Sequence, residues 1–526
     1  MLIFSIFLAL GCSDGLSEHD AGIDASTDAG GDMEPDGTPD AGADTNKDAG
    51  TYDGSDSGQD EISDATPGDT ENDAGDDTTQ CQVAIDHTPI EKAQLGDILI
   101  EADVSGAENV TLYYRRAGQV ELKAIPMEQG QHYTATIPEA DVTFAPMKYL
   151  IEATDGVCTV RQPQDDLYNI RIWGTKRITT EAEIYDYLPS VYDNLVVFSK
   201  EKAAGTEDNT WIFDLHSFEF TQITHLAKSQ GAADIYGQNL VWVDSRNDDS
   251  EPNPDIYLYD LESGQEHQVT TDPLGQYGEV IFDRIIAWRD DRNMTGPIDG
   301  DIYLYDMGPD KKFGTQDDIG EIRLTPNQAD QSAPDVHVDQ TGRVRIVWSD
   351  FRDDTDGVCD ANCNWNIYMY DFGPDGLYGT GDDSGPHQVT SDPLEQTSPV
   401  IYGHTIAWRD ARDGDWLHPD IYYYDLGDDG QFGTQDDSGV RKLPVDVIEA
   451  NDLDIWENRL VYDDYRNSSY EIYLFDFSSN KETAITSSPR GQFYPKIFGR
   501  TIVWQDARNN DPDGEPFDDI YVHVLP

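Results

Sequence analysis

Short apolar segments alternate with polar turns along most of the chain, and one pattern recurs. Residues 403–412 alternate apolar and polar positions around the core W-x-D-x-R, and residues 420–425 follow as a D-I-Y strand. Alternation with a period of two residues predicts strands rather than helices. Copies of the core are Trp242/Asp244/Arg246, Trp288/Asp290/Arg292, Trp348/Asp350/Arg352, Trp408/Asp410/Arg412 and Trp504/Asp506/Arg508, with Tyr462/Asp464/Arg466 as a tyrosine variant.

These copies divide the C-terminal region into units that each hold four strands. In one unit the strands are residues 398–402, 405–409, 421–425 and 440–443. A degenerate copy at residues 195–214, without the Asp and the Arg, precedes the others and makes seven units. Repeats of roughly forty to fifty residues with four short strands each predict a seven-bladed β-propeller over residues 174–526. The expected fold class is therefore all-β.

The last unit ends after its third strand, because the chain ends there. Residues 176–180 precede the first unit and are similar to the fourth strands elsewhere, such as residues 268–271 and 388–391. We expect this segment to complete the last sheet as a strand clasp. Such a clasp closes the ring and removes exposed sheet edges.

The repeated W-x-D-x-R core has two interpretations. Its three residues share one face of a strand, and one buried Trp contributes on the order of 4–6 kcal/mol through the burial of about 150–250 Å². Because the core recurs, we favour an architectural role in which Asp and Arg hold neighbouring blades or loops. Contact with a ligand stays open as the alternative.

The order I-A-W-x-D-x-R, D-I-Y-x-Y-D and Q-V-T, as in residues 286–292 and 301–306, resembles the propeller repeats of the TolB family. The resemblance covers roughly residues 187–526. Two features depart from it: the S-P-D-G turn is replaced by shorter turns, and no counterpart of the small α/β domain that precedes the TolB propeller is present. The resemblance implies the propeller fold and no place in the Tol system.

Charge limits the class of partner. The chain of 526 residues carries 104 acidic and 34 basic side chains, a formal net charge of −70. Such a chain repels nucleic acids and anionic lipid surfaces, so we expect neither DNA nor RNA as a partner. Cations are the natural counterparts.

The N-terminus resembles a bacterial lipoprotein signal. Residues 1–11 form an apolar run that is too short to span a bilayer, and Cys12 follows as the expected lipidated residue. The basic n-region of such signals is absent, and an ordinary cleaved signal peptide is the alternative. Ser13 after Cys12 favours the outer membrane by analogy with Gram-negative lipoproteins. We therefore expect a lipid-anchored protein of the cell envelope, at the outer membrane or cell surface.

Residues 12–80 are rich in Asp, Gly, Ala, Thr and Ser, with Lys47 as the one basic residue. A segment with so few apolar residues cannot bury enough surface to fold, so we expect a disordered acidic tether. Its end-to-end distance as a flexible coil is roughly 45 Å. A calcium sponge is the alternative use.

Residues 81–173 alternate in period two at positions 98–102, 110–115, 133–137 and 147–153. These strands resemble an immunoglobulin-like or fibronectin type III sandwich, a module that usually acts as a spacer or adhesive unit. Cysteines flank it: Cys81 precedes the first strand, and Cys158 follows the last hairpin at the same pole. We expect Cys81 to pair with Cys158, and Cys359 with Cys363, in an oxidising compartment.

Three adjacent units carry an insert with the pattern D-x-x-[FY]-G-T-x-D-D between their third and fourth strands. A Gly-rich turn can fold so that the first Asp and the final Asp pair surround one hard cation, which is the way calcium is bound. A solvated Asp/Gly turn is the alternative. The candidate calcium ligands are Asp310, Asp317 and Asp318; Asp375, Asp382 and Asp383; and Asp429, Asp436 and Asp437.

The loops between second and third strands form the opposite face. Their candidate binding residues, at the expected channel mouth, are Asp354, Asp356, Asp415, Trp416 and His418. The alternative is that Trp416 packs on a neighbouring blade and that His418 is solvated. We find no G-x-S-x-G elbow, H-E-x-x-H helix or phosphate loop in the sequence.

These features favour a non-enzymatic envelope protein whose propeller binds a protein or glycan partner, with calcium as a candidate cofactor. An extracellular lyase or hydrolase of glycans is the alternative, and it would use carboxylates at the channel mouth such as Asp354, Asp356 and Asp415. A coat component that assembles with itself is a third hypothesis.

Overall fold

The computed structural model describes residues 81–181, 184–202, 208–247, 253–294, 299–354, 363–413, 417–510 and 517–526. Apart from the short 3-10 helix η1 (Glu139–Asp141), the regular elements in these ranges are strands, which confirms the all-β prediction. None of the described helical residues forms a segment long and apolar enough to cross a membrane. The predicted signal peptide, Cys12 and the predicted tether lie outside the described residues.

Residues 84–177 contain two sheets that pack face to face. The first contains β1 (Ala84–Asp86), β3 (Ile98–Ser105), β7 (Tyr133–Ile137) and β6 (Glu128–Gln129) in spatial order. The second contains β10 (Tyr168–Arg177), β8 (Met147–Thr154), β4 (Asn109–Arg116) and β5 (Lys123–Pro126), with β2 (Lys92–Gln94) on β10 and β9 (Thr159–Gln162) on β8. Alternate residues of β3 and β8 are buried in one shared core, so the predicted strands are confirmed.

A disulfide joins Cys81 to Cys158, as predicted, across a sequence separation of 77 residues. It connects the start of this domain to the hairpin that follows β8. Cys359 lies outside the described residues, so its pairing with Cys363 stays a prediction.

Six four-stranded antiparallel sheets follow in chain order. The first three contain β11 (Ile184–Tyr192), β12 (Leu195–Lys202), β13 (Asp208–Asp214) and β14 (Glu219–Gln222); β15 (Gln230–Tyr236), β16 (Asn239–Asp244), β17 (Asp255–Asp260) and β18 (Gln265–Gln268); and β19 (Gln276–Phe282), β20 (Ile285–Asp290), β21 (Asp301–Asp306) and β22 (Gly320–Arg323). The next three contain β23 (Gln331–Val338), β24 (Val344–Asp350), β25 (Asn366–Asp371) and β26 (Ser384–Gln388); β27 (Gln396–Tyr402), β28 (Thr405–Asp410), β29 (Asp420–Asp425) and β30 (Arg441–Lys442); and β31 (Ala450–Trp456), β32 (Arg459–Asp464), β33 (Glu471–Asp476) and β34 (Lys481–Ala484).

A last sheet is formed from both ends of this region. Its strands β35 (Gln492–Phe498), β36 (Thr501–Asp506) and β37 (Asp519–Val524) pair in order, and β10 continues from the preceding domain to pair with β37. Residues Gly174 to Arg177 of β10 lie antiparallel to β37. The predicted segment therefore supplies the missing fourth strand, and the pairing begins two residues earlier than expected.

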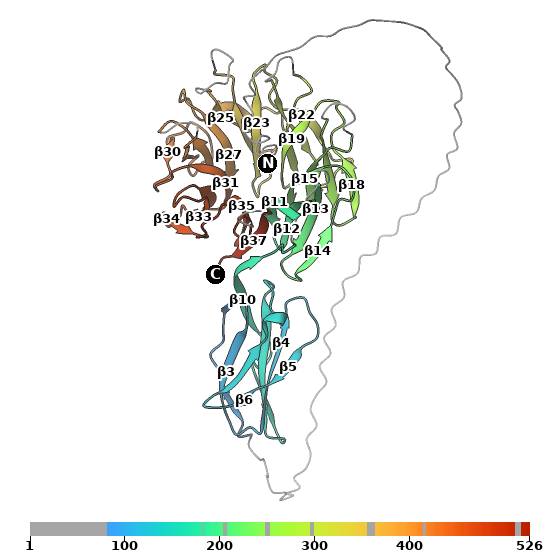
Figure 1. The fold of residues 1–526 in the computed structure, drawn as a ribbon, viewed down its shortest axis with the longest axis vertical. Coiled ribbons are helices and arrows are strands. Elements are labelled where there is room, and N and C mark those ends of the chain that lie inside the picture. Colours follow the sequence, from blue (N-terminus) through green and yellow to red (C-terminus); the bar gives the residue numbers. More distant parts are fainter. Residues whose placement is uncertain are drawn as a thin grey trace, which may run out of the picture. The chain divides into compact units, whose positions relative to one another are not determined.

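The first strands of the sheets surround a common centre (Figure 1). Each of them, from β11 to β35, contacts the first strand of the next sheet, and β35 contacts β11. This arrangement is that of a β-propeller. Every first strand also contains a register shift, as between Gly231 and Asp234 in β15. Bulges of this kind occur next to barrel rims and functional sites, because they change the direction in which side chains point.

The repeated Trp, Asp and Arg side chains form the same set of contacts in the five sheets that carry a Trp core, whereas the hydroxyl of Tyr462 donates to Glu482 instead. Trp408 is fully buried, its indole Nε1 donates to Asp410 Oδ2 at 2.8 Å, and Arg412 donates to both oxygens of Asp410. The Arg412 guanidinium also lies 4.5 Å from the ring centre of Tyr422 on the adjacent third strand. This supports the architectural interpretation, but the contacts hold one sheet and its own loop. The expected tie to a neighbouring blade is not formed by these atoms.

Candidate functional site

The three Asp/Gly inserts adopt one shared geometry. They connect β21 to β22, β25 to β26 and β29 to β30. In the second insert, the hydroxyl of Thr380 lies 3.4 Å from Asp375 Oδ1, 2.6 Å from Asp382 Oδ1 and 3.0 Å from Asp383 Oδ1. The backbone carbonyl of Leu377 lies 3.3 Å from the same hydroxyl. Corresponding contacts surround Thr434 in the third insert.

These contacts contain more acceptors than donors. A threonine hydroxyl has one proton and can donate to one oxygen at a time. Asp375 Oδ1 also accepts the N–H of Leu377 at 2.9 Å. Among the described residues, the Thr380 hydroxyl is the one donor to both Asp382 Oδ1 and Asp383 Oδ1, so these two oxygens share a single proton. Calcium takes six to eight oxygen ligands, including carboxylates and backbone carbonyls. The donor set of the inserts thus fits a hard divalent cation.

The predicted ligands come together as a cluster of three carboxylates in the first and third inserts, and Asp375, Asp382 and Asp383 of the second insert do not meet the same distance limit. One carboxylate oxygen from each of Asp310, Asp317 and Asp318 lies within 4.8 Å of the other two, and the same holds for Asp429, Asp436 and Asp437. The Thr315 hydroxyl lowers the pKa of Asp317, so this carboxylate is charged at neutral pH. Tyr305 of β21 donates to Asp318 Oδ2 at 2.5 Å and fixes its orientation.

The candidate binding residues of the opposite face are only partly described. Asp356, Asp415 and Trp416 lie outside the described residues. Asp354 is half-buried, and its Oδ2 accepts a hydrogen bond from the backbone N–H of Asn364 at 3.3 Å, which supports the loop. His418 is exposed.

The centre of the propeller contains a ring of aromatic and imidazole side chains, one from the end of each first strand. Neighbouring ring centres are 4.1–4.8 Å apart around the complete circle. Phe282 also lies 6.2 Å from both Tyr402 and Trp456 across the circle, so the rings fill this end of the channel. The members of this aromatic circle are Tyr192, Tyr236, Phe282, His337, Tyr402, Trp456 and Phe498.

Four of the first strands carry a charged side chain two residues before their member of the aromatic circle. These side chains are Asp234, Asp335, Asp454 and Lys496. Asp335 Oδ2 accepts the N–H of Ile401 in the next sheet at 2.7 Å, and Asp234 and Asp454 accept the corresponding N–H groups of their neighbours. The Lys496 ammonium lies 4.0 Å from Asp454, and its side chain is 42% exposed although it belongs to an inner strand. The inner strands therefore leave space beside the Lys496 side chain. Enclosure raises the pKa of Asp335 to about 7, with a further contribution from Asp454.

A second pair of carboxylates is formed by Asp452 on the first strand β31 and Asp463 on the second strand β32. Asp463 is fully buried, and its Oδ1 accepts the backbone N–H groups of Asn451 and Asp452 at 3.1 and 2.6 Å. Burial, followed by the nearby charge of Asp452, raises the pKa of Asp463. Burial also raises the pKa of the half-buried Asp452. Two neighbouring carboxyl groups with raised pKa values form an acid/base candidate.

The sequence interpretation overlooked both features of the channel. The aromatic circle had a readable signal, because every first strand carries an aromatic residue or histidine after a β-branched residue at or next to its last position. Asp463 also had one: it is the acidic residue at the x position of a W-x-D-x-R copy. Its proximity to Asp452 depends on the bulge in β31, which the sequence does not reveal.

Comparisons with known proteins come from solved structures. No protein-family model matches the chain. No curated protein matches its sequence. The β-propeller domain of the trilobed protease from Pyrococcus furiosus is similar, with 12% identity over 66% of this chain and 94% of that domain and a TM-score of 0.46.

TolB from Acinetobacter baumannii is similar with 12% identity over 68% of this chain and 79% of its own, with a TM-score of 0.37. An oligogalacturonate lyase from Vibrio parahaemolyticus is similar with 12% identity over 67% of this chain and 93% of its own, with a TM-score of 0.45. At these values none of the three assigns an activity to this chain.

Proposed function

We propose that the chain is a non-enzymatic protein of the cell envelope, anchored by lipid at Cys12, whose propeller binds a protein or glycan partner with the help of calcium. In this proposal an acidic tether and an immunoglobulin-like or fibronectin III-like spacer present a seven-bladed propeller, closed by the pairing of β10 with β37. The net charge of −70 supports the expectation that nucleic acids are not partners.

The observation that carries the proposal is the crowding of oxygens in the three inserts. In three adjacent hairpins, the hydroxyls of Thr315, Thr380 and Thr434 each lie within hydrogen-bond distance of two Asp carboxylates. A bound cation would neutralise the facing carboxylates and stiffen three neighbouring projections. A surface prepared in this way suits recognition, because preformed elements lose less entropy on binding.

The test compares calcium with chelator on residues 81–526. We expect calcium to raise the melting temperature and to be required for the retention of one partner from solubilised envelope or secreted polysaccharide. Asp429→Asn should weaken calcium binding at its insert about tenfold or more, because a charged ligand is lost. Asp428→Asn is the matched control, since Asp428 is an exposed neighbour outside the shared set. Equal calcium titrations for wild type and Asp429→Asn would refute the assignment.

The alternative function, a lyase or hydrolase of glycans, is favoured by one observation, the carboxyl pair of Asp452 and Asp463. Incubation with neutral and acidic polysaccharides, followed by measurement of chain length, tests it. Shortening by the wild type that Asp452→Asn abolishes and Asp428→Asn preserves would establish the enzyme and end the non-enzymatic proposal.

A further inference from the structure

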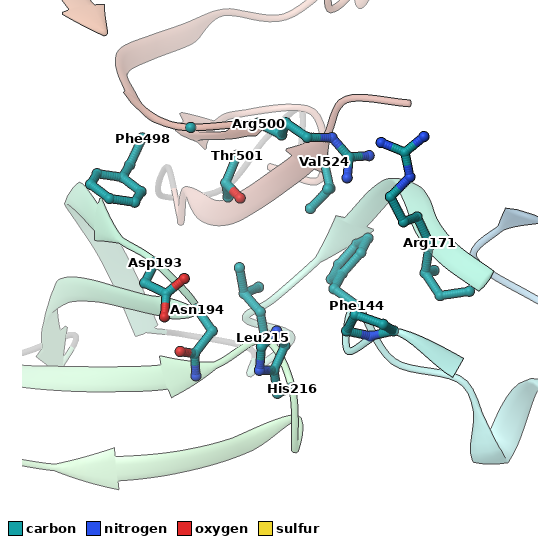
Figure 2. Close-up of a pocket in the computed structure, with 13 residues that line it drawn as sticks. Phe144, Arg171, Asp193, Asn194, Leu215, His216, Phe498, Arg500, Thr501 and Val524 are labelled. Atoms are coloured by element: carbon teal, nitrogen blue, oxygen red, sulfur yellow. The ribbon is translucent and has the colours of Figure 1, made fainter. Parts of the chain in front are cut away.

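A cavity of about 330 Å³ lies where β10 meets the first and last sheets of the propeller (Figure 2). Phe144, Leu215, Phe498 and Val524 form apolar walls, and the N–H of Phe144 donates to the carbonyl of Leu215 at 3.1 Å. The cavity lies within one compact unit of the chain. Its volume is at the lower end of the range of small-molecule sites, which is about 300–1,000 Å³.

Two guanidinium groups lie side by side at one end of this cavity, those of Arg171 from β10 and Arg500 from the turn between β35 and β36 (Figure 2). Within the part of the chain that the structure describes, neither forms an ion pair with a carboxylate. Arg284 and Arg343, like the Arg of each W-x-D-x-R core, pair with aspartates, whereas Arg409, Arg459 and Arg490 also lack an ion pair among the described residues. Arg171 and Arg500 are distinguished by the proximity of their two guanidinium groups, in a chain with 104 acidic and 34 basic residues.

Arg500 is also incompletely hydrogen-bonded. One of its Nη atoms donates to the carbonyl of Leu525, whereas its buried Nε has no partner among the described residues. Burial and the adjacent charges of Arg171 and Arg459 lower the pKa of Arg500. Like charges held this close repel each other, and an anion between them would remove the repulsion.

The other side chains of the cavity indicate which kind of ligand carries the anionic group. Asn194 and Thr501 offer polar side chains, and Asp193 lies at the end opposite to the two arginines (Figure 2). An inorganic anion would use the guanidinium end alone. An organic ligand with a carboxylate, hydroxyl groups and an apolar ring face would use the arginines, the polar side chains and the apolar walls together.

We propose that this cavity binds the carboxylate of a ligand about the size of one sugar ring, a hexuronate, through Arg171 and Arg500. The inference deepens the proposed function on one point, since it names acidic glycans as the class of partner. The guanidinium fork matches a carboxylate with two parallel N–H···O bonds, and Asp193 at the opposite end of the cavity repels the carboxylate and so sets the orientation.

The test is a titration of the purified full-length chain with glucuronate, with glucose and inorganic phosphate as comparison ligands. We expect saturable binding of glucuronate that is at least about tenfold tighter than that of glucose or phosphate. Titration with an oligouronate in parallel distinguishes a free monosaccharide from the terminal unit of a polymer, because tighter binding of the oligomer identifies the polymer as the source.

Arg171→Gln should weaken glucuronate binding at least about tenfold. Arg171 is exposed, so this variant keeps the core intact, and its melting curve verifies the fold. Arg161→Gln is the matched control, because Arg161 is an exposed arginine of the same domain that pairs with Glu152. The proposal is wrong if Arg171→Gln binds glucuronate as the wild type does, or if glucose or phosphate binds equally well.

The insert variant separates this inference from the calcium proposal. Asp429→Asn should leave glucuronate binding unchanged, because Asp429 does not line the cavity. Loss of glucuronate binding in Asp429→Asn would contradict an independent site. Loss of calcium binding with retained glucuronate binding leaves this inference standing.

Discussion

The second strands and the first strands of the propeller carry polar side chains in different ways. On the second strands that carry a Trp core, the Asp accepts from the Trp and the Arg of its own copy, so most polar groups of that set are satisfied within one sheet, although Arg246 Nε has no partner among the described residues. On the first strands, Asp335 bonds to the next sheet, while Glu279 Oε1 and His337 Nδ1 are buried without a hydrogen-bond partner among the described residues. The repeated side chains hydrogen-bond to one another and stabilise each sheet. The polar side chains around the centre differ from one first strand to the next, so they can differ in chemical role.

The largest expected effect comes from breaking a repeated set. Trp408→Ala should lower the free energy of unfolding by about 3–5 kcal/mol, because it leaves a cavity and removes a donor from Asp410. Chemical denaturation measures this change. Leu417→Ala is the control: Leu417 is 50% exposed, so we expect a change within about 0.5 kcal/mol. A small effect of Trp408→Ala would mean that the repeated sets do not hold the sheets.

An intermediate effect should appear at the first strands and should depend on pH. Asp335 binds its proton more tightly in the folded chain, where its pKa is raised to about 7, than in the unfolded chain. Its contribution therefore favours folding below about pH 4 and is lost as the pH rises to about 7. Asp335→Asn removes this dependence and should be the more stable form at neutral pH, by on the order of 2–4 kcal/mol.

Denaturation of wild type and Asp335→Asn at several pH values measures the difference. The gap between the two curves should widen between about pH 4 and pH 7 and stay constant above it. A gap that is independent of pH would show that Asp335 is charged throughout and that the centre is better solvated than its enclosure indicates.

The smallest effect should follow from a conservative change in a repeated set. Arg246→Lys keeps the charge beside Asp244 but loses the planar contact with Tyr257, whose ring centre is 4.0 Å away. We expect a loss of about 1 kcal/mol in the free energy of unfolding. Arg441→Lys, at an exposed position, should change it by less than half as much. Equal values for both would show that stacking on the third strand adds nothing to the Asp–Arg pair.

Much of the fold could be predicted because its causes are local. The alternation around Trp408 placed β28, the D-I-Y sequence placed β29, and the disulfide between Cys81 and Cys158 followed from their positions at one pole. The insert carboxylates were also predictable, because the first and last Asp of each lie in one hairpin. These features join residues that are close in sequence or have matching positions in a repeat.

The channel and the arginine cavity were not predicted from the same sequence. Asp452 and Asp463 are near each other because a bulge turns β31, and nothing in their spacing reveals that bulge. Arg171 and Arg500 belong to different domains and meet because β10 crosses into the last sheet. Their lack of carboxylate partners depends on where the carboxylates of the described residues lie in space, which the sequence does not show.

The sequence by itself determined the strands, the repeat and the groups that each unit satisfies internally, because period-two alternation and a buried Trp act within a few residues. Only the tertiary structure decided which residues meet at the centre and at the junction with β10. A ring places one residue from each sheet next to residues that are remote in the chain. Contacts of this kind depend on the closure of the whole ring and leave no local pattern in the sequence.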